Sequence, residues 1–174
     1  MARLLREGRE TAEGETGQLS QTAVVVGVGN RLRGDDAVGC LVVEALKGRT
    51  DAALFDAETA PENYIEPVAK LNPARILLID ACDFGGRPGE YRLFGRDEIE
   101  RLAMGLVSTH ALPLTMTAQL LGQRTRADVW LLGVQPERVD FGAGMSRAVA
   151  KAMPAIVEFV REWLCPEQTG ASLR

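Results

Sequence analysis

The sequence of 174 residues has few of the residues on which several common classes of protein depend. Its three cysteines, Cys40, Cys82 and Cys165, are far apart and form no CxxC or CxxH pair, so neither a disulfide framework nor a thiolate zinc site is indicated. There is one histidine, His110, and no HExxH motif. A GxSxG motif is absent, and no cysteine has an evident histidine partner, so the usual serine, cysteine and zinc protease patterns are excluded.

The sequence also lacks an excess of basic residues and long hydrophobic runs. A net charge of -4, a pI near 5.2 and scattered lysines and arginines argue against a nucleic-acid surface. No apolar run reaches the length of a membrane span, and the first 20 residues have no apolar stretch typical of a signal peptide. Together with the unpaired cysteines, these absences predict a cytoplasmic protein that binds neither nucleic acid nor membrane.

What the sequence contains is enough for one domain with a sizeable core. It is 46% apolar, and its length is too short for two comfortable domains. Residues 1–21 alternate charged residues with glycine and threonine, and we expect a flexible N-terminal extension there. The single α/β domain is then expected over residues 22–164, with a flexible C-terminal tail over residues 165–174.

Strand-like and helix-like patterns alternate through this domain. We expect strands near 22–28, 53–56, 74–80, 90–94 and 127–134, and helices near 36–48, before residue 70, from residue 96, near 112–122 and near 145–164. Continuous apolar runs such as ARILLID are typical of strands buried on both faces, whereas EYRLF alternates and predicts an edge strand. Pro154 predicts a kink or a restart in the last helix. The alternation predicts an α/β/α three-layer sandwich around a mostly parallel, doubly wound sheet of about five strands.

A glycine-containing loop, GVGNRLRGDDAVG, lies between the first strand and the first helix, where nucleotide-binding loops occur. Leu32 occupies the position of the third glycine of the dinucleotide fingerprint, and Asp35 and Asp36 stand where a phosphate loop has Lys and Ser or Thr. These carboxylates would repel phosphate, so no nucleotide cofactor is expected. Because acids are favoured at a helix N-terminus, we expect Asp35 to cap the helix and leave Asp36 free.

Three side chains are candidates to meet at the carboxyl edge of the sheet. Asp36 follows the first strand, and Asp80 ends a buried strand, where an acid is costly unless it is paired or bound to metal. His110 leads into a helix whose dipole favours the neutral, metal-binding imidazole. Each has a structural alternative, as a cap, a turn residue or a hydrogen-bonded loop histidine. Together they would supply ligands for a first-row divalent ion.

Five ordered blocks resemble the hydrogenase maturation endopeptidases, particularly the type that serves the hydrogenase of formate hydrogenlyase. The blocks are GVGNRLRGDDAVG, TAPENY, LLIDACDFGGRPGE, STHALPL and LLGVQPERVDF, and the likeness runs from about Thr22 to Trp163. The resemblance implies an α/β/α fold and a cytoplasmic enzyme. It also implies removal of a short C-terminal extension from the precursor of the [NiFe]-hydrogenase large subunit after nickel insertion.

The resemblance implies the same three site residues, with Asp36 as the metal-binding acid after the first strand, Asp80 as the strand-end aspartate and His110 as the histidine. Nickel is expected to be carried by the precursor, with Asp36 or Asp80 as general base of an aspartic-type endopeptidase. The sequence departs from many relatives at residues 56–59, where DAET replaces a segment with a Gly-Gly pair. We expect that segment to take part in substrate selection.

Two other classes of function stay open. A nickel-dependent chaperone without peptidase activity would bind the precursor through the same three residues. A dinucleotide-dependent oxidoreductase is the other class, and Leu32 at the third-glycine position disfavours it.

Overall fold

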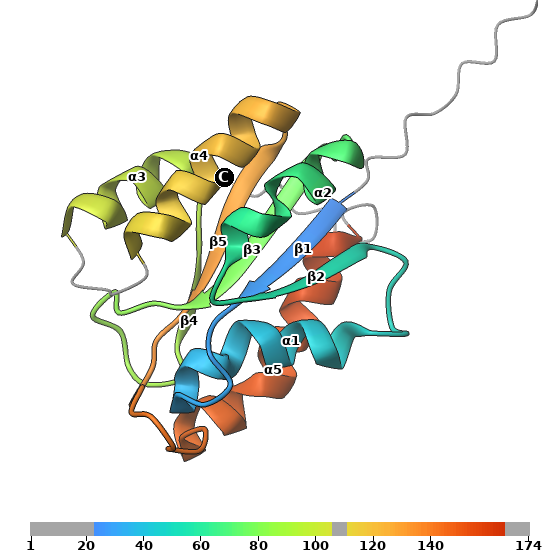
Figure 1. Cartoon of the computed structure of the whole chain (residues 1–174). Coiled ribbons are helices and arrows are strands. Elements are labelled where there is room, and N and C mark those ends of the chain that lie inside the picture. The colour runs from blue at the N-terminus through green and yellow to red at the C-terminus, as the bar shows by residue number, and fades with distance from the viewer. Residues whose placement is uncertain (1–22, 106–110, 166–174) are drawn as a thin grey trace, which may run out of the picture.

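The computed structural model describes residues 23–105 and 111–165 (Figure 1). Its strands are β1 (Ala23–Val28), β2 (Ala53–Glu58), β3 (Arg75–Ala81), β4 (Tyr91–Phe94) and β5 (Asp128–Val134). Its helices are α1 (Val38–Leu46), α2 (Ile65–Lys70), α3 (Arg96–Gly105), α4 (Ala111–Thr125) and α5 (Arg147–Leu164), with short 3-10 helices η1 (Gly34–Ala37) and η2 (Pro61–Tyr64). The predicted extension, residues 1–21, lies outside the described residues, as do His110 and all but the first residue of the predicted tail.

The strands form one sheet in the order β2-β1-β3-β5-β4. The first four are parallel, and β4 is an antiparallel edge strand paired with β5. In Figure 1, α1 and α5 lie on one face of the sheet, and α2, α3 and α4 lie on the other. The predicted α/β/α sandwich is therefore confirmed. The domain boundaries near residues 21 and 164 stay a prediction.

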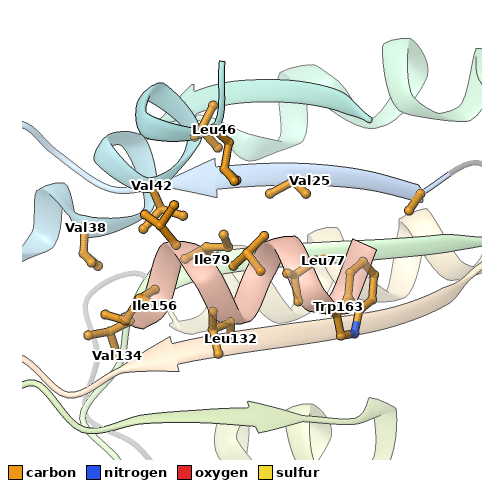
Figure 2. Close-up of a cluster of buried hydrophobic side chains, with 14 of the residues drawn as sticks. Val25, Val38, Val42, Leu46, Leu77, Ile79, Leu132, Val134, Ile156 and Trp163 are labelled. Carbon is orange, nitrogen blue, oxygen red and sulfur yellow. The ribbon is translucent and has the colours of Figure 1, made fainter. Parts of the chain in front are cut away.

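Each face of the sheet has its own apolar core. Figure 2 shows the first, in which side chains of β1, β3 and β5 pack against those of α1 and α5. The second joins the opposite face of the same strands to α2, α3 and α4. Because both faces are covered, the central strands are apolar except near their ends, as their sequences predict. None of the helices described here is long and apolar enough to cross a membrane.

Three local predictions need correction. The predicted helix from Asp36 begins instead as the 3-10 helix η1, and α1 starts at Val38. Strand β2 continues two residues beyond Asp56, because its end pairs with β1 through an irregular register opposite Gly27 and Val28. Of the two alternatives at Pro154, the restart is wrong, since α5 is continuous through it, and the kink stays a prediction.

Glycines let α1 approach the sheet at backbone distance. A Cβ atom at Gly39 would lie 2.2 Å from the carbonyl oxygen of Ile79 and 2.3 Å from that of Val28. A Cβ atom at Gly27 would lie 2.2 Å from the carbonyl oxygen of Gly39, so both sides of this contact require glycine. The contact holds the start of α1, and with it Asp36, against the carboxyl ends of β1 and β3.

We expect Gly39→Ala to lower the free energy of unfolding by about 3 kcal/mol, because the added methyl group meets backbone that cannot rotate away. Urea unfolding followed by circular dichroism measures this loss. Gly144→Ala is the matched control, since a Cβ atom there has no heavy atom within 4 Å. Equal stability of the two variants would contradict the close approach of α1 to the sheet.

Candidate active site

Two of the three predicted site residues come together where the strand order reverses. From β1 the chain runs through α1 to β2, which lies on one side of β1. Strand β3 lies on the other side of β1, so the direction in which strands are added reverses there. Parallel sheets bind ligands at such a position, outside the carboxyl ends of the strands. Asp36 lies in η1, directly after β1, and Asp80 lies near the end of β3. Both are buried, with 5% and 3% of their surfaces exposed.

The two carboxyl groups interact electrostatically. Burial, and after it the negative charge of Asp36, raises the pKa of Asp80 to about 8 from an ordinary 3.8, although the backbone N–H of Ala81 works in the opposite direction. Asp36 has a partner, because its Oδ2 accepts a hydrogen bond of 3.0 Å from the backbone N–H of Asn30. The buried Oδ1 of Asp80 has no hydrogen-bond partner in the described part of the chain. A cation between the two groups would satisfy this oxygen and reverse the pKa shift.

Asp35 does not cap a helix, contrary to the prediction. No side-chain cap hydrogen bond is present at the start of η1 or α1. Instead, Oδ1 of Asp35 accepts from the N–H of Ser146 at 2.7 Å, and its Oδ2 accepts from those of Glu137 and Arg138 at 2.8 and 3.1 Å. Asp35 is fully buried and ties the loop after β1 to the loop between β5 and α5.

Sequence reasoning missed Gln135, which follows β5. Its Oε1 accepts from the N–H groups of Phe84 and Gly86, both at 3.0 Å, and its Nε2 donates to Oδ1 of Asp83 at 3.1 Å. These bonds hold the loop that follows Asp80. The sequence gives only a weak sign of this role, a polar amide directly after an apolar strand in LLGVQ, and does not reveal its partners.

The segment that departs from many relatives lies at the same edge of the sheet. Arg31 donates hydrogen bonds to Asp56 at 2.6 Å and to Glu44 at 2.8 Å, which fixes the loop after β1 to the end of β2. Burial opposes ionisation of Asp56, but the hydrogen bond from Arg31 helps to lower its pKa overall. Glu58 is exposed and has a φ of +48°, a left-handed conformation that glycine adopts more easily. Strain of this kind is often kept at functional sites.

Two buried thiols lie near acidic side chains, Cys82 near Asp80 and Cys40 near Asp56. Cys82 is two residues from Asp80, and the Cys40 Sγ donates to the carbonyl oxygen of Gly29 at 3.5 Å. Burial is the largest cause that raises the pKa of each thiol to about 12. Without a metal ion both thiols stay protonated at neutral pH, so neither is a ready nucleophile.

The third predicted ligand, His110, lies outside the described residues. Within residues 23–105 and 111–165, no group of three or more histidine, cysteine, aspartate or glutamate side chains is placed to hold a metal ion. What these residues provide is a pair of buried carboxyl groups with one free oxygen. Such a pair can bind a cation, or accept a proton from a nucleophile at neutral pH.

Comparisons with known proteins point to one family. The family described as hydrogenase maturation protease matches residues 40–163. The chain is 33% identical to the hydrogenase 3 maturation protease of Escherichia coli K12 over 144 residues, which cover 82% of this chain and 90% of that protein.

Solved structures agree with the sequence matches. The [NiFe] hydrogenase maturation protease HycI of Thermococcus kodakarensis is 33% identical, with a TM-score of 0.73 over 83% of this chain and 92% of that one. The endopeptidase HycI of Escherichia coli is 32% identical, with a TM-score of 0.72 over 82% of this chain and 90% of that one. The sequence and the fold are therefore similar to the same group of proteins.

The raised pKa of Asp80 predicts a pH-dependent stability. The folded protein keeps this proton up to about pH 8, whereas the unfolded chain releases it near pH 3.8. The folded state therefore binds more protons between these values, so a rise in pH destabilises it through this group, by up to about 1.4 kcal/mol per pH unit. We expect the stability of Asp80→Asn relative to the unsubstituted protein to increase from pH 5 to pH 8. Urea unfolding at each pH measures it.

The control for this measurement is Asp51→Asn, which removes an exposed carboxylate remote from Asp80 in the sequence. The free energy of unfolding of this variant should change with pH in the same way as that of the unsubstituted protein. A parallel curve for Asp80→Asn as well would mean that Asp80 ionises in the folded state as it does in the unfolded chain.

Asp35→Asn tests the tie between the two loops. An amide offers one acceptor oxygen and turns an NH2 group toward backbone donors, so we expect a loss of about 2 kcal/mol in the free energy of unfolding. Limited proteolysis should also cut the loop over residues 136–146 more rapidly. Asp140→Asn, an exposed change in that loop, should leave both measurements unchanged. Unaltered proteolysis of Asp35→Asn would show that these hydrogen bonds do not hold the loop.

Proposed function

We propose a substrate and a mechanism from the premise that the chain belongs to the hydrogenase maturation protease family and is an endopeptidase. The substrate is the precursor of a [NiFe]-hydrogenase large subunit, and cleavage removes a short C-terminal extension. The names of the relatives support a hydrogenase as the target, and the sequence resemblance supports the large-subunit precursor. The enzyme is cytoplasmic and of the aspartic type.

Nickel is carried by the precursor and meets Asp36, Asp80 and His110 when the precursor binds. One observation carries this proposal, namely the buried Oδ1 of Asp80 that lacks a partner among the described residues, beside a second carboxyl group. Carboxylates and a neutral imidazole are suitable ligands for a divalent first-row ion. Because the metal belongs to the substrate, the three residues distinguish a loaded precursor from an empty one.

Protonation of Asp80 supports this discrimination. With a pKa of about 8, Asp80 is mostly neutral at pH 7 without a cation, so it offers an empty precursor no second negative charge. The approach of a divalent ion favours ionisation, and binding is therefore coupled to release of a proton. Asp36 is the other acid, held by its hydrogen bond from Asn30.

Cleavage requires a base that takes a proton from the attacking water. Asp36 and Asp80 are the candidates, and an acid whose pKa lies near the working pH suits this role. The nickel ion can polarise the carbonyl group of the cleaved peptide bond or acidify the water. The substrate's own metal then contributes both to recognition of the precursor and to restricting cleavage to the stage after nickel insertion.

The test is a mass measurement on the precursor incubated with the full chain. We expect loss of a C-terminal peptide from the nickel-loaded precursor and no change in the nickel-free precursor. Asp80→Asn should slow processing by at least about 100-fold, because a ligand and one of the two candidate bases are lost. His110→Ala should abolish processing. Asp51→Asn is the surface control and should cleave normally.

The possible results separate the alternatives. A stable complex without a mass change would contradict peptidase activity and favour the chaperone function. Cleavage of both precursor forms would contradict nickel recognition. Normal processing by His110→Ala would show that His110 does not take part in the reaction.

A further inference from the structure

Three large apolar side chains are exposed on two loops beside the candidate active site. Leu32, in the loop after β1, is 60% exposed, while Val139 and Phe141, between β5 and α5, are 40% and 75% exposed. Single exposed apolar residues are ordinary, but a group on adjoining loops is typical of an interaction surface. We call these three residues the apolar platform.

Hydrogen bonds to backbone carbonyl oxygens join the two loops that carry the platform. The N–H of Gly142 donates to the carbonyl oxygen of Leu32 at 2.7 Å, and Nε of Arg33 donates to that of Val139 at 3.1 Å. The N–H of Gly34 donates to the carbonyl oxygen of Ala143 at 3.0 Å. The buried carboxylate of Asp35 adds its three bonds to the same loops. The backbone that presents the platform is fixed, so a partner that binds there loses little entropy in ordering it.

The platform borders the paired carboxyl groups. Strand β3, which carries Asp80, lies between β1 and β5 in the sheet. The loops that follow these two flanking strands therefore join beside the end of β3. In Figure 1, the blue segment leading into η1 and the orange loop leading into α5 lie at the same edge. Asp36 is separated from Leu32 by only three residues in the chain.

Charges near the platform balance. Arg33 and Arg138 carry positive charge, and each donates through Nε to a backbone carbonyl oxygen. Glu137 and Asp140 carry negative charge on the same loop. These four charges cancel, and Arg31, which precedes Leu32, is paired with two acids outside the two loops. No strong excess of one sign surrounds the platform, which favours an uncharged, apolar partner over a strongly acidic or basic one.

We propose that Leu32, Val139 and Phe141 dock an apolar segment of the precursor near the peptide bond that is cleaved. The inference rests on the proposed function, because an endopeptidase substrate is a polypeptide that continues beyond the reacting groups. The platform is continuous with the carboxyl groups through η1. It holds the precursor in place, while Asp36 and Asp80 remain responsible for the chemistry.

The experiment uses the full chain and nickel-loaded precursor, with Leu32→Ser and Phe141→Ser combined in one variant. We expect at least a ten-fold higher Kd and KM and a kcat within two-fold of the unsubstituted chain, because binding is lost and the reacting groups stay in place. Phe141→Leu, which preserves an apolar surface, should stay within three-fold in Kd. The combined variant should keep its Tm, since both side chains are exposed in the folded protein.

The controls are Met116→Ser and Leu71→Ser, which remove apolar side chains that are 57% and 42% exposed in α4 and at the end of α2. Their Kd and KM should not change. Equal losses in the platform variant and in the controls would overturn the inference, as would an unchanged Kd of the platform variant.

Binding and cleavage are measured separately so that the two proposals fail separately. If the unsubstituted chain binds the precursor without cleaving it, the proposed peptidase mechanism fails. The Kd values then still show whether the platform binds the precursor. Absence of both binding and cleavage overturns both proposals. If the chain sediments as a dimer that the platform variant converts to a monomer, and precursor binding is unchanged, the platform instead binds a second copy of the chain.

Discussion

The buried carboxylate of Asp35 is the interaction on which the arrangement of the site depends. It holds three backbone N–H groups of a loop more than 100 residues away in the chain, at distances of 2.7 to 3.1 Å. Charge-assisted bonds of this kind are stronger than neutral ones, and this carboxylate is shielded from water. Because Asp36 is the next residue, the same contact fixes the acid that faces Asp80.

Local patterns in the sequence determine much of the architecture. Apolar runs bounded by turns identify β1, β3 and β5, and the alternating EYRLF identifies β4 as the edge strand. The rule that ligands bind beyond the carboxyl ends of parallel strands places Asp36 and Asp80 together. The structure brings them close enough for the charge of Asp36 to affect the pKa of Asp80.

The rest depends on contacts between distant segments, which no local pattern contains. Asp35 at the start of a helical segment has the features of a cap, yet its partners are Glu137, Arg138 and Ser146. Gln135 gives little sign in the sequence that it holds the loop after β3. The left-handed backbone of Glu58 likewise depends on the irregular pairing of β1 and β2. His110 lies outside the described residues, so its place in the site stays a prediction.

The protonated thiols of Cys40 and Cys82 bear on what happens to the metal after cleavage. Thiolates hold nickel tightly, whereas a neutral thiol is a poor ligand and carboxylates exchange metal readily. With both thiol pKa values near 12, a metal ion would have to displace a tightly held proton before either sulfur could bind it, whereas Asp36 and Asp80 offer hard oxygen ligands. If nickel arrives on the precursor as proposed, contact through these oxygens favours leaving it in the precursor. The mature subunit would leave with its metal, and one protease molecule would serve many precursors in succession.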